Sequence, residues 1–288
     1  MTPEPLPSPS SSPVPSPRPL PWADCPAADL QAVHGVLTDI DDTLTVDGAI
    51  APEALQALQA LRDAGVPVLA ITGRPMGWSE PFARDWPLDA IVAENGAVAL
   101  FRDGDALRTE YAQDLATRQH NARRLAEVAQ RVLREVPGTT LARDSAGRVT
   151  DIAIDHSEFC TLDAPSIDAV VALMRSEGMR ATVSSIHING WFGEHDKLSG
   201  ARWMVQRLYG RDVDAPRTAW VYVGDSTNDQ RMFGHFPISV GVANLMRFEH
   251  ELSVWPRYLA QHERGRGFAE VVQRLLDARR ARLQPVSS

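Results

Sequence analysis

Three aspartates stand directly after an apolar run near residue 40, and their spacing is suited to holding a hard metal ion. The segment GVLTDIDDTLT, residues 35–45, carries Asp39, Asp41 and Asp42 among apolar residues of the kind found in a buried parallel strand. Carboxylates this close repel one another, so a packed protein keeps them where a cation compensates, and Mg²⁺ prefers oxygen ligands. A solvated, Asp-rich turn at a strand end explains the same residues. The stretch by itself leaves both interpretations open.

Polar residues that could assist such a site recur at three later points of the chain. Two groups follow the apolar runs VPVLAI and AWVYV, and a single lysine stands at the start of a predicted helix. The residues are Thr72, Gly73, Arg74, Lys197, Asp225, Asn228 and Asp229. Taken singly, each is an ordinary strand-end or surface residue. The carboxyl ends of parallel strands meet at one edge of a sheet, so we expect these groups to lie together with the first three aspartates.

Apolar runs alternate with helical patterns along the chain, which predicts an α/β fold with a doubly wound parallel sheet. We expect strands at 35–40, 66–71, 219–223 and 238–242, and helices at 52–64, 197–208 and about 267–283. In the first of these helices Leu55, Leu58 and Leu61 form the predicted apolar face. Asn95-Gly96 lies between two apolar runs and predicts a hairpin with a structural role.

The middle of the chain has a different pattern. Residues 113–190 predict a small sheet with two helices on one face, with helices at 115–135 and 164–178 and strands at 149–156 and 181–191. This α+β segment interrupts the parallel sheet. We therefore expect an inserted domain, 113–190, within a core domain made of 33–112 and 191–288.

Residues 1–32 are dominated by Pro and Ser, which predicts a disordered tail because such a segment has little to bury. A polyproline ligand for a partner domain is the alternative interpretation of the same composition.

Composition limits the class of protein. The 288 residues carry a net charge of −8 without a long basic run, which argues against a nucleic acid partner. No apolar run is long enough to cross a membrane, and Cys25 and Cys160 are too few for a disulfide framework. We expect a cytoplasmic protein, and the sequence gives no oligomeric state.

The ordered set DxDxT, TGR, a helix-initial lysine and GDxxND resembles the haloacid dehalogenase superfamily of phosphotransferases, and the likeness runs from residue 33 onward. The insertion resembles the type-two, subtype-B cap, an α/β lid over the active site. Within the superfamily the chain is similar to the sucrose-phosphate phosphatase and mannosyl-3-phosphoglycerate phosphatase branches. The Ser184-Ser185 pair contributes to that similarity, whereas Asp42 departs from the glycine that many relatives carry.

The resemblance implies a role for each motif residue. Asp39 would attack phosphorus and form an aspartyl-phosphate, and Asp41 would act as general acid and base. Lys197 and Thr72, with Gly73 and Arg74, would contact the phosphoryl group. The expected Mg²⁺ site comprises Asp39, Asp41 through its carbonyl, Asp225, Asn228 and Asp229, with the last two acting mainly through waters or Lys197.

His187, Asn189 and Trp191 alternate onto one face of the last strand of the insertion. Two interpretations stay open for them: contact with substrate, where the resemblance makes His187 and Asn189 binding residues, or structural pairing with the hairpin.

The activity implied is hydrolysis of a small phosphorylated metabolite, a sugar or glycerate phosphate. A phosphomutase of the phosphomannomutase type shares the same cap and core, and it would have to exclude water while the intermediate waits. A regulatory binding module that kept the fold is the third possibility, although every residue that the mechanism requires is present.

Overall fold

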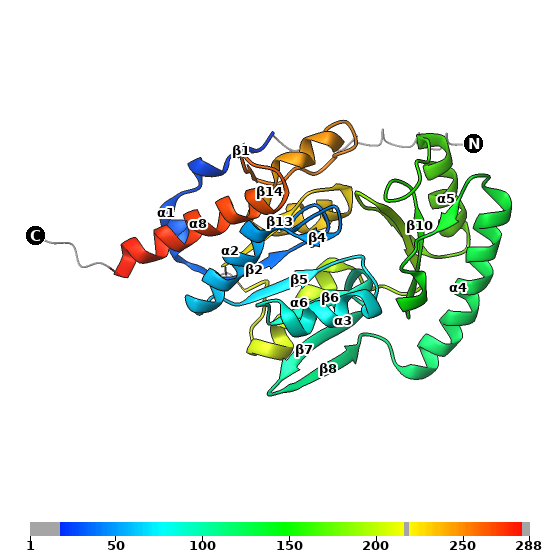
Figure 1. The fold of residues 1–288 in the computed structure, drawn as a ribbon, viewed down its shortest axis with the longest axis horizontal. Coiled ribbons are helices and arrows are strands. Elements are labelled where there is room, and N and C mark those ends of the chain that lie inside the picture. Colours follow the sequence, from blue (N-terminus) through cyan, green and yellow to red (C-terminus); the bar gives the residue numbers. More distant parts are fainter. Residues whose placement is uncertain (1–17, 216–218, 284–288) are drawn as a thin grey trace, which may run out of the picture.

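The computed structural model describes residues 18–215 and 219–283. Its centre is a nine-stranded sheet in the order β1-β15-β14-β13-β2-β5-β6-β7-β8 (Figure 1). In this order, each of the first seven strands, β1 to β6, pairs in parallel with its neighbour. The last two strands, β7 and β8, pair antiparallel. Their bounds are β1 Leu20–Pro21, β2 Val33–Thr38, β5 Val68–Ile71, β6 Ala90–Ala93, β7 Val98–Asp103, β8 Ala106–Tyr111, β13 Ala219–Gly224, β14 Ile238–Gly241 and β15 Tyr258–Leu259.

Helices cover both faces of this sheet and bury its apolar side chains in two separate clusters. One cluster packs α2 and α8 against the sheet, and the other packs α6 and α7 against the opposite face. This is the three-layer arrangement that a parallel sheet of apolar strands requires. The helices are α1 Ala27–Gln31, α2 Pro52–Asp63, α3 Met76–Asp85, α6 Lys197–Tyr209, α7 Gln230–His235 and α8 Arg264–Leu283. The predicted α/β fold is confirmed.

In α2 one prediction is wrong. Leu58 and Leu61 are fully buried as expected, but Leu55 is 39% exposed. The buried face of α2 is made of Ala54, Ala57, Leu58 and Leu61, which follow the spacing of three and four residues of one helix face, and Leu55 lies at the edge of that face.

A second sheet of four strands, in the order β11-β12-β10-β9, stands beside the first. Its strands are β9 Thr140–Leu141, β10 Asp151–Asp155, β11 Arg180–Val183 and β12 His187–Trp191. Helices α4 (Leu115–Glu135) and α5 (Ala164–Ser176) cover the face that points away from the large sheet (Figure 1). The other face, with His187 and Asn189, is turned toward the large sheet. We call residues 113–190 the cap and the remainder the core, as a proposal about domain organisation.

The single strand expected at 181–191 is instead a hairpin of β11 and β12. The two strands pair antiparallel, and Ser184 closes the turn by donating its backbone N–H to the carbonyl of His187 (2.8 Å). Its hydroxyl oxygen also accepts from the backbone N–H of His187 (3.0 Å). Short polar side chains of this kind favour turns over extended backbone, and the serine pair therefore marks the break.

The prediction that residues 1–32 form a disordered tail is wrong for residues 18–32. Residues 18–32 contribute β1, a short 3₁₀ turn and α1, and the side chains of Trp22, Cys25 and Leu30 are almost completely buried in the core. These three scattered apolar residues are enough to dock the segment on the core, because β1 pairs with β15 and α1 packs on α8. Residues 1–17, where the Pro/Ser repeats are densest, lie outside the described residues.

Within the described residues, no helix is both long and apolar enough to span a membrane.

Candidate active site

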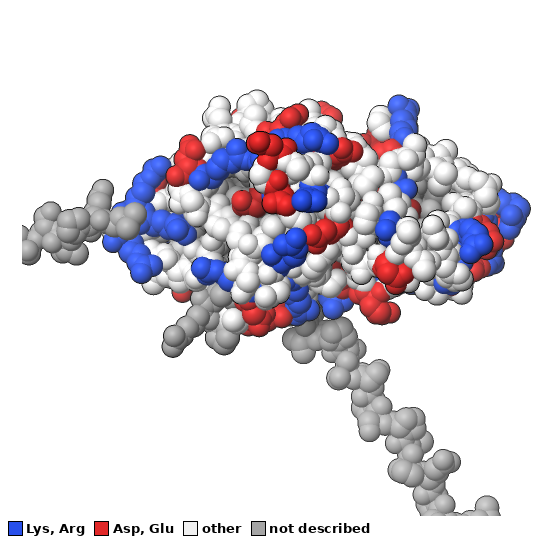
Figure 2. Space-filling model, turned by 90° about the horizontal axis from the view of Figure 1, so that it is seen from below, with Lys and Arg blue, Asp and Glu red and all other residues white. Residues whose placement is uncertain are grey.

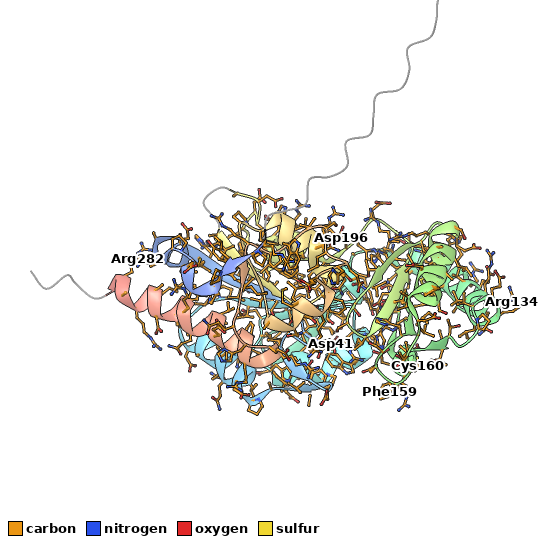
Figure 3. The ribbon with its side chains drawn as sticks, turned by 90° about the horizontal axis from the view of Figure 1, so that it is seen from above. Asp41, Arg134, Phe159, Cys160, Asp196 and Arg282 are labelled. Atoms are coloured by element: carbon orange, nitrogen blue, oxygen red, sulfur yellow. The ribbon has the colours of Figure 1, made fainter. Side chains whose placement is uncertain are left out.

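The carboxyl ends of β2, β5 and β13 bring the sequence motifs to one place. Asp39 follows β2, and its backbone N–H donates to the carbonyl of Val223 in β13 (2.9 Å). Thr72 follows β5, and Asp225 follows β13. Because the three strands are neighbours and parallel, their polar ends meet at a single edge of the sheet. Figure 3 shows Asp41 at the junction of core and cap, far from both ends of the molecule.

Lys197 links the first and last motifs. It is the first residue of α6, and its Nζ donates to Asp39 Oδ1 at 2.6 Å and to Asp229 Oδ1 at 2.7 Å. A longer contact of 3.4 Å reaches Asn228 Oδ1. Only 4% of Lys197 is exposed. A buried ammonium between two carboxylates keeps its charge, and the two aspartates raise its pKa even though burial lowers it.

Asp229 has all of its hydrogen-bonding capacity in use. Besides Lys197, Oδ1 accepts from the Tyr222 hydroxyl at 2.5 Å. Oδ2 accepts from the backbone N–H groups of Asp225 (2.9 Å) and Ser226 (3.3 Å). A side chain at Gly224 would lie 2.4 Å from this oxygen, so only glycine fits there. The carboxylate of Asp229 is therefore committed to organising its neighbours.

Asp225 has a contrasting environment. It is fully buried, and its hydrogen bonds to the carboxylate are long ones, 3.3 Å from Asn244 Nδ2 and 3.5 Å from the Thr43 hydroxyl. Burial, with Asp39 and Asp229 nearby, raises its pKa well above the ordinary value. Such a carboxylate is suited to a directly bound cation, which would offset both the burial and the repulsion.

Oxygen atoms of Asp39, Asp225 and Asp229 lie within 4.8 Å of one another. Burial raises the pKa of Asp39 to about 7, with Asp229 and Asp41 adding to the effect and Lys197 opposing it. An oxygen-only donor set with excess negative charge fits Mg²⁺, with Asp39 and Asp225 as the carboxylates free to bind it. Three of the five predicted metal residues, Asp39, Asp225 and Asp229, thus lie together in a cluster that suits the ion.

Arg74 joins the core to the cap. Its guanidinium donates to both carboxylate oxygens of Asp41 at 2.9–3.0 Å, and also to Glu158 (2.7 Å) and Asp144 (3.1 Å) of the cap. Only 5% of Arg74 is exposed. Its carboxylate partners raise its pKa, although burial lowers it. Arg74 therefore orients Asp41 and at the same time holds two cap residues over it.

Two cap side chains hold the loop that follows β5. The Gly73 carbonyl accepts from Arg148 Nη1 (2.9 Å) and from Asn189 Nδ2 (3.3 Å). His187 contacts Glu158 through Nε2 at 2.9 Å. Trp191 is used for packing, with its indole N–H donating to the carbonyl of His195 at 2.9 Å. Of the three alternating residues, His187 and Asn189 lie in the network that reaches the site.

Several residues in this network were not predicted. Glu94 is fully buried in the core, and its carboxylate accepts from the backbone N–H groups of Val149 (3.0 Å) and Thr150 (2.6 Å) in the cap. Asp144, Arg148, Asp151 and Glu158 were also missed. For Glu94 the signal was available, because it follows the buried strand β6 at the same edge as the other motifs. The hairpin pattern around Asn95-Gly96 concealed it.

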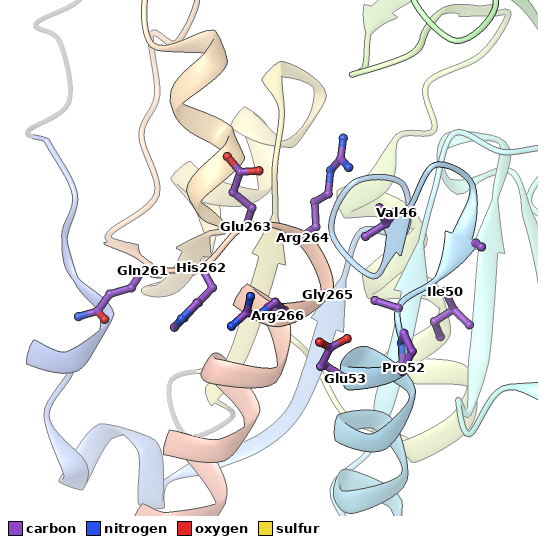
Figure 4. A pocket seen from close by; sticks show the side chains of 12 residues that line it. Val46, Ile50, Pro52, Glu53, Gln261, His262, Glu263, Arg264, Gly265 and Arg266 are labelled. Carbon is purple, nitrogen blue, oxygen red and sulfur yellow. The ribbon is translucent and has the colours of Figure 1, made fainter.

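A cavity of about 650 Å³ lies away from these residues (Figure 4). It is formed by the β3–β4 hairpin (Thr45–Val46, Ala49–Ile50) and the start of α8. None of the predicted site residues lines it. Arg264, which lines this cavity, pairs with Asp42 at 2.9 Å.

Both of these residues have left-handed backbone, with φ of 53° for Arg264 and 54° for Asp42. A positive φ is the conformation that glycine adopts most readily, and Asp tolerates it better than most other residues.

Comparison with known proteins finds a family pattern and a relative that match this chain. The sequence pattern described as haloacid dehalogenase-like hydrolase matches residues 36–129. A phosphoglycolate phosphatase of Methanothermobacter thermautotrophicus is 25% identical over 248 residues, which cover 85% of this chain and 99% of that protein.

Solved structures share the fold at lower identity. A Thermoplasma acidophilum protein superposes with a TM-score of 0.64 at 15% identity, over 85% of this chain and 98% of that one. The sucrose-phosphatase of Synechocystis, solved with sucrose and phosphate, gives 0.58 at 18% identity, over 84% and 98%. With the four motifs gathered at one sheet edge, the matches show the haloacid dehalogenase-like hydrolase pattern over residues 36–129 and the fold of these solved structures over most of the chain.

Proposed function

We propose that this protein is a Mg²⁺-dependent phosphatase that hydrolyses a small phosphorylated metabolite, a sugar or glycerate phosphate, through an aspartyl-phosphate on Asp39. The observation that carries the proposal is the contact of 2.6 Å between Lys197 Nζ and Asp39 Oδ1, beside the buried carboxylates of Asp225 and Asp229. The phosphatase names of the relative from Methanothermobacter thermautotrophicus and of the Synechocystis structure support the same reaction class.

In the first step, a carboxylate oxygen of Asp39 attacks phosphorus and the bond from phosphorus to the ester oxygen breaks. Lys197 already holds Oδ1, which leaves Oδ2 as the attacking oxygen. Asp41 gives a proton to the departing alcohol oxygen. Thr72 and the backbone N–H of Gly73 donate to the phosphoryl oxygens as negative charge spreads over them.

In the second step, a water molecule attacks the aspartyl-phosphate, Asp41 takes its proton, and inorganic phosphate leaves with Asp39 restored. The Arg74 guanidinium donates to both oxygens of Asp41 at 2.9–3.0 Å and so orients this carboxyl group for both proton transfers. Asp39, Asp225 and the Asp41 carbonyl would hold Mg²⁺, with Asn228 and Asp229 behind them, and the ion would offset the repulsion between Asp39 and the phosphate.

The cap would close the site against solvent. Its contacts with the core through Glu94, Arg74 and Gly73 support a division into a core (33–112 and 191–288) and a cap (113–190). A cytoplasmic location also stays part of the proposal.

The proposal is tested by measuring the release of inorganic phosphate from a panel of phosphorylated metabolites. The assay contains Mg²⁺ and no bisphosphate activator. We expect release from sugar or glycerate phosphates and none by the Asp39→Asn variant. Transfer of phosphate between positions of a sugar, dependent on a bisphosphate, would show a phosphomutase instead. Binding of a phosphorylated metabolite without any turnover would show a regulatory module.

A further inference from the structure

A pocket of about 340 Å³ lies between cap and core, beside Lys197. Its core side comes from the turn after β6, the start of α6 and the turn after β13, and its cap side from α5, β11 and β12. It is lined by Asn95, Arg175, Met179, Arg180, Ala181, Thr182, Trp191, Asp196, Lys197, Leu198, Asn228 and Arg231. None of the proposed reaction steps uses this pocket, although Lys197 and Asn228 belong to both.

Asn95 gives the pocket a buried donor. It is 2% exposed, and its side-chain Nδ2 has no hydrogen-bond partner among the described residues. Its backbone is held in the left-handed region (φ 54°), between Glu94 (φ 49°) and Gly96 (φ 106°). Two consecutive non-glycine residues in this conformation are costly and persist where the surrounding structure requires them.

An unpaired buried amide is also costly, unless a ligand with an acceptor atom satisfies it. The backbone N–H of Asn95 donates to the Thr72 carbonyl at 2.9 Å, so this donor is fixed beside the proposed phosphate loop.

The cap contributes a second unpaired group from the opposite wall. The hydroxyl oxygen of Thr182 in β11 is buried and has no hydrogen-bond partner within the part of the chain that the structure describes. A hydroxyl can donate to an anion as readily as it accepts. Asn95 and Thr182 together therefore offer one donor from the core and one from the cap.

Three arginines line the pocket: Arg175, Arg180 and Arg231. Arg231 Nη1 lies 2.5 Å and Arg180 Nη1 3.8 Å from the same oxygen, Asp196 Oδ2. The other oxygen, Oδ1, caps α6 by accepting from the Ser199 N–H at 2.8 Å.

One carboxylate thus serves two guanidinium groups, and Arg175 adds a third cation to the lining. Glu194 also pairs with Arg180, but it is 91% exposed on its side chain, so water screens that pair. In a chain with a net charge of −8, this concentration of positive charge is local. Figure 3 places Asp196, like Asp41, at the junction of core and cap.

We propose that this pocket binds a carboxylate, or a similarly small oxyanion, which the substrate carries at the end remote from its phosphoryl group. The inference rests on the proposed phosphatase function and narrows it to acidic phosphomonoesters. Lys197 and Asn95 provide the link, because each lines the pocket and also contacts a residue of the proposed phosphate site. The arginines contribute charge, and the buried, unpartnered groups of Asn95 and Thr182 contribute hydrogen bonds.

Two phosphomonoesters of similar length test the proposal, 2-phosphoglycolate with a carboxylate and 2-hydroxyethyl phosphate without one. We expect the wild type to favour 2-phosphoglycolate in kcat/KM, and Arg180→Gln and Arg231→Gln to lower that preference about tenfold while leaving turnover of 2-hydroxyethyl phosphate unchanged. Arg202→Gln is the matched control, since Arg202 lies on α6 outside the pocket and pairs with Asp214 at 2.8 Å. Equal effects on both substrates, or none on the ratio, would overturn the proposal.

Binding separates this inference from the reaction itself. In the Asp39→Asn background, calorimetry should show 2-phosphoglycolate bound about tenfold more weakly when Arg180→Gln is added. If neither ester is hydrolysed but this difference appears, the phosphatase function fails and the anion pocket stands. A third outcome is that added glycolate changes wild-type turnover of 2-hydroxyethyl phosphate, while the two arginine variants leave the preference for 2-phosphoglycolate unchanged. The pocket would then bind a free anion, and the proposal that it binds a carboxylate of the substrate would be wrong.

Discussion

Asp225 and Asp229 differ in the hydrogen bonds that their carboxylate oxygens accept, and we infer different roles for them from this difference. Both carboxylate oxygens of Asp229 already accept hydrogen bonds, from Lys197, Tyr222 and the backbone. Among the described residues, the Asp225 carboxylate accepts only the two long hydrogen bonds from Thr43 and Asn244. A divalent ion placed between Asp39 and Asp225 would therefore gain two carboxylates without displacing an existing contact.

We expect Asp225→Asn to weaken Mg²⁺ binding more than Asp229→Asn, for which a loss of about 10- to 100-fold is typical of a residue behind the ligands. Isothermal titration of Mg²⁺ into the two purified variants measures the difference. Asp47→Asn, at an 89% exposed side chain outside the cluster, is the control. Equal affinities for the two variants would mean that the cluster is wrongly assigned.

Asp39→Asn should abolish turnover and leave the protein folded, because the amide keeps the size of the side chain but is no nucleophile. The measurement is phosphate release with circular dichroism as the check on folding. Activity close to that of the wild type would rule out the covalent mechanism.

His195 gives a prediction about pH. Burial lowers its pKa to about 4, with Arg180 lowering it further and Asp196 and Glu194 opposing, and its Nε2 has no partner among the described residues. Between pH 4 and about 6.5 the unfolded chain binds a proton here that the folded protein does not. The free energy of unfolding should therefore fall as the pH is lowered through this range, by up to about 3 kcal/mol. Urea unfolding of wild type and His195→Gln tests this, and parallel pH profiles would contradict it.

At the scale of elements, the ends of the strands were predictable and the contacts between core and cap were not. Asp39, Thr72 and Asp225 each follow a local apolar run, and a parallel sheet brings such ends together without further information. Arg74 was recognised from its motif, but its partners Asp144 and Glu158 are 70 and 84 positions away on cap loops with no pattern of their own. Contacts of that kind depend on how two sheets face each other.

The N-terminal elements were missed for a related reason. Trp22 and Leu30 stand alone among Pro and Ala, so no periodicity marks them, and only the surfaces of α8 and β15 turn them into core residues. Composition predicts order or disorder reliably only where neighbouring residues in the sequence determine whether a segment is buried.

The burial of α1 can be tested with two leucines. Leu30→Ala should lower the free energy of unfolding by about 2–5 kcal/mol, because Leu30 is completely buried. Leu20→Ala, at a side chain that is 50% exposed, should change it by less than about 0.5 kcal/mol. Chemical denaturation of both variants gives the comparison. A small effect at Leu30 would mean that α1 is not docked in solution.

For the whole molecule, charge is distributed unevenly around a net value of −8. In the view of Figure 2, several Lys and Arg side chains lie at one end of the molecule. The last turn of α8 contains Arg280 and Arg282, and Figure 3 shows Arg282 at the end of the molecule away from the cap. Acidic groups are instead buried at the centre, at the junction with the cap. The folded chain therefore carries a central electrostatic penalty that a bound cation would relieve.

Mg²⁺ should accordingly raise the melting temperature, because it binds the folded protein and not the unfolded chain. At about 100 times the dissociation constant the gain is about 2.7 kcal/mol, or several degrees. Differential scanning fluorimetry with Mg²⁺, with chelator and with the Asp225→Asn variant measures it. The same shift in that variant would show that the ion acts elsewhere.

The pairing of β1 with β15 has a consequence for how the protein is made. Arg274 and Arg279 of α8 donate to the carbonyls of Cys25 (2.6 Å) and Val33 (2.7 Å), so the first described elements are completed only by the last. During synthesis on the ribosome, residues 20–33 emerge early and wait for residues 258–282 before they find their partners. The apolar side chains of Trp22 and Leu30 and the open edge of β14 stay exposed over that interval. Contacts of such long sequence separation slow folding, and they make the nascent chain dependent on reaching its final helix.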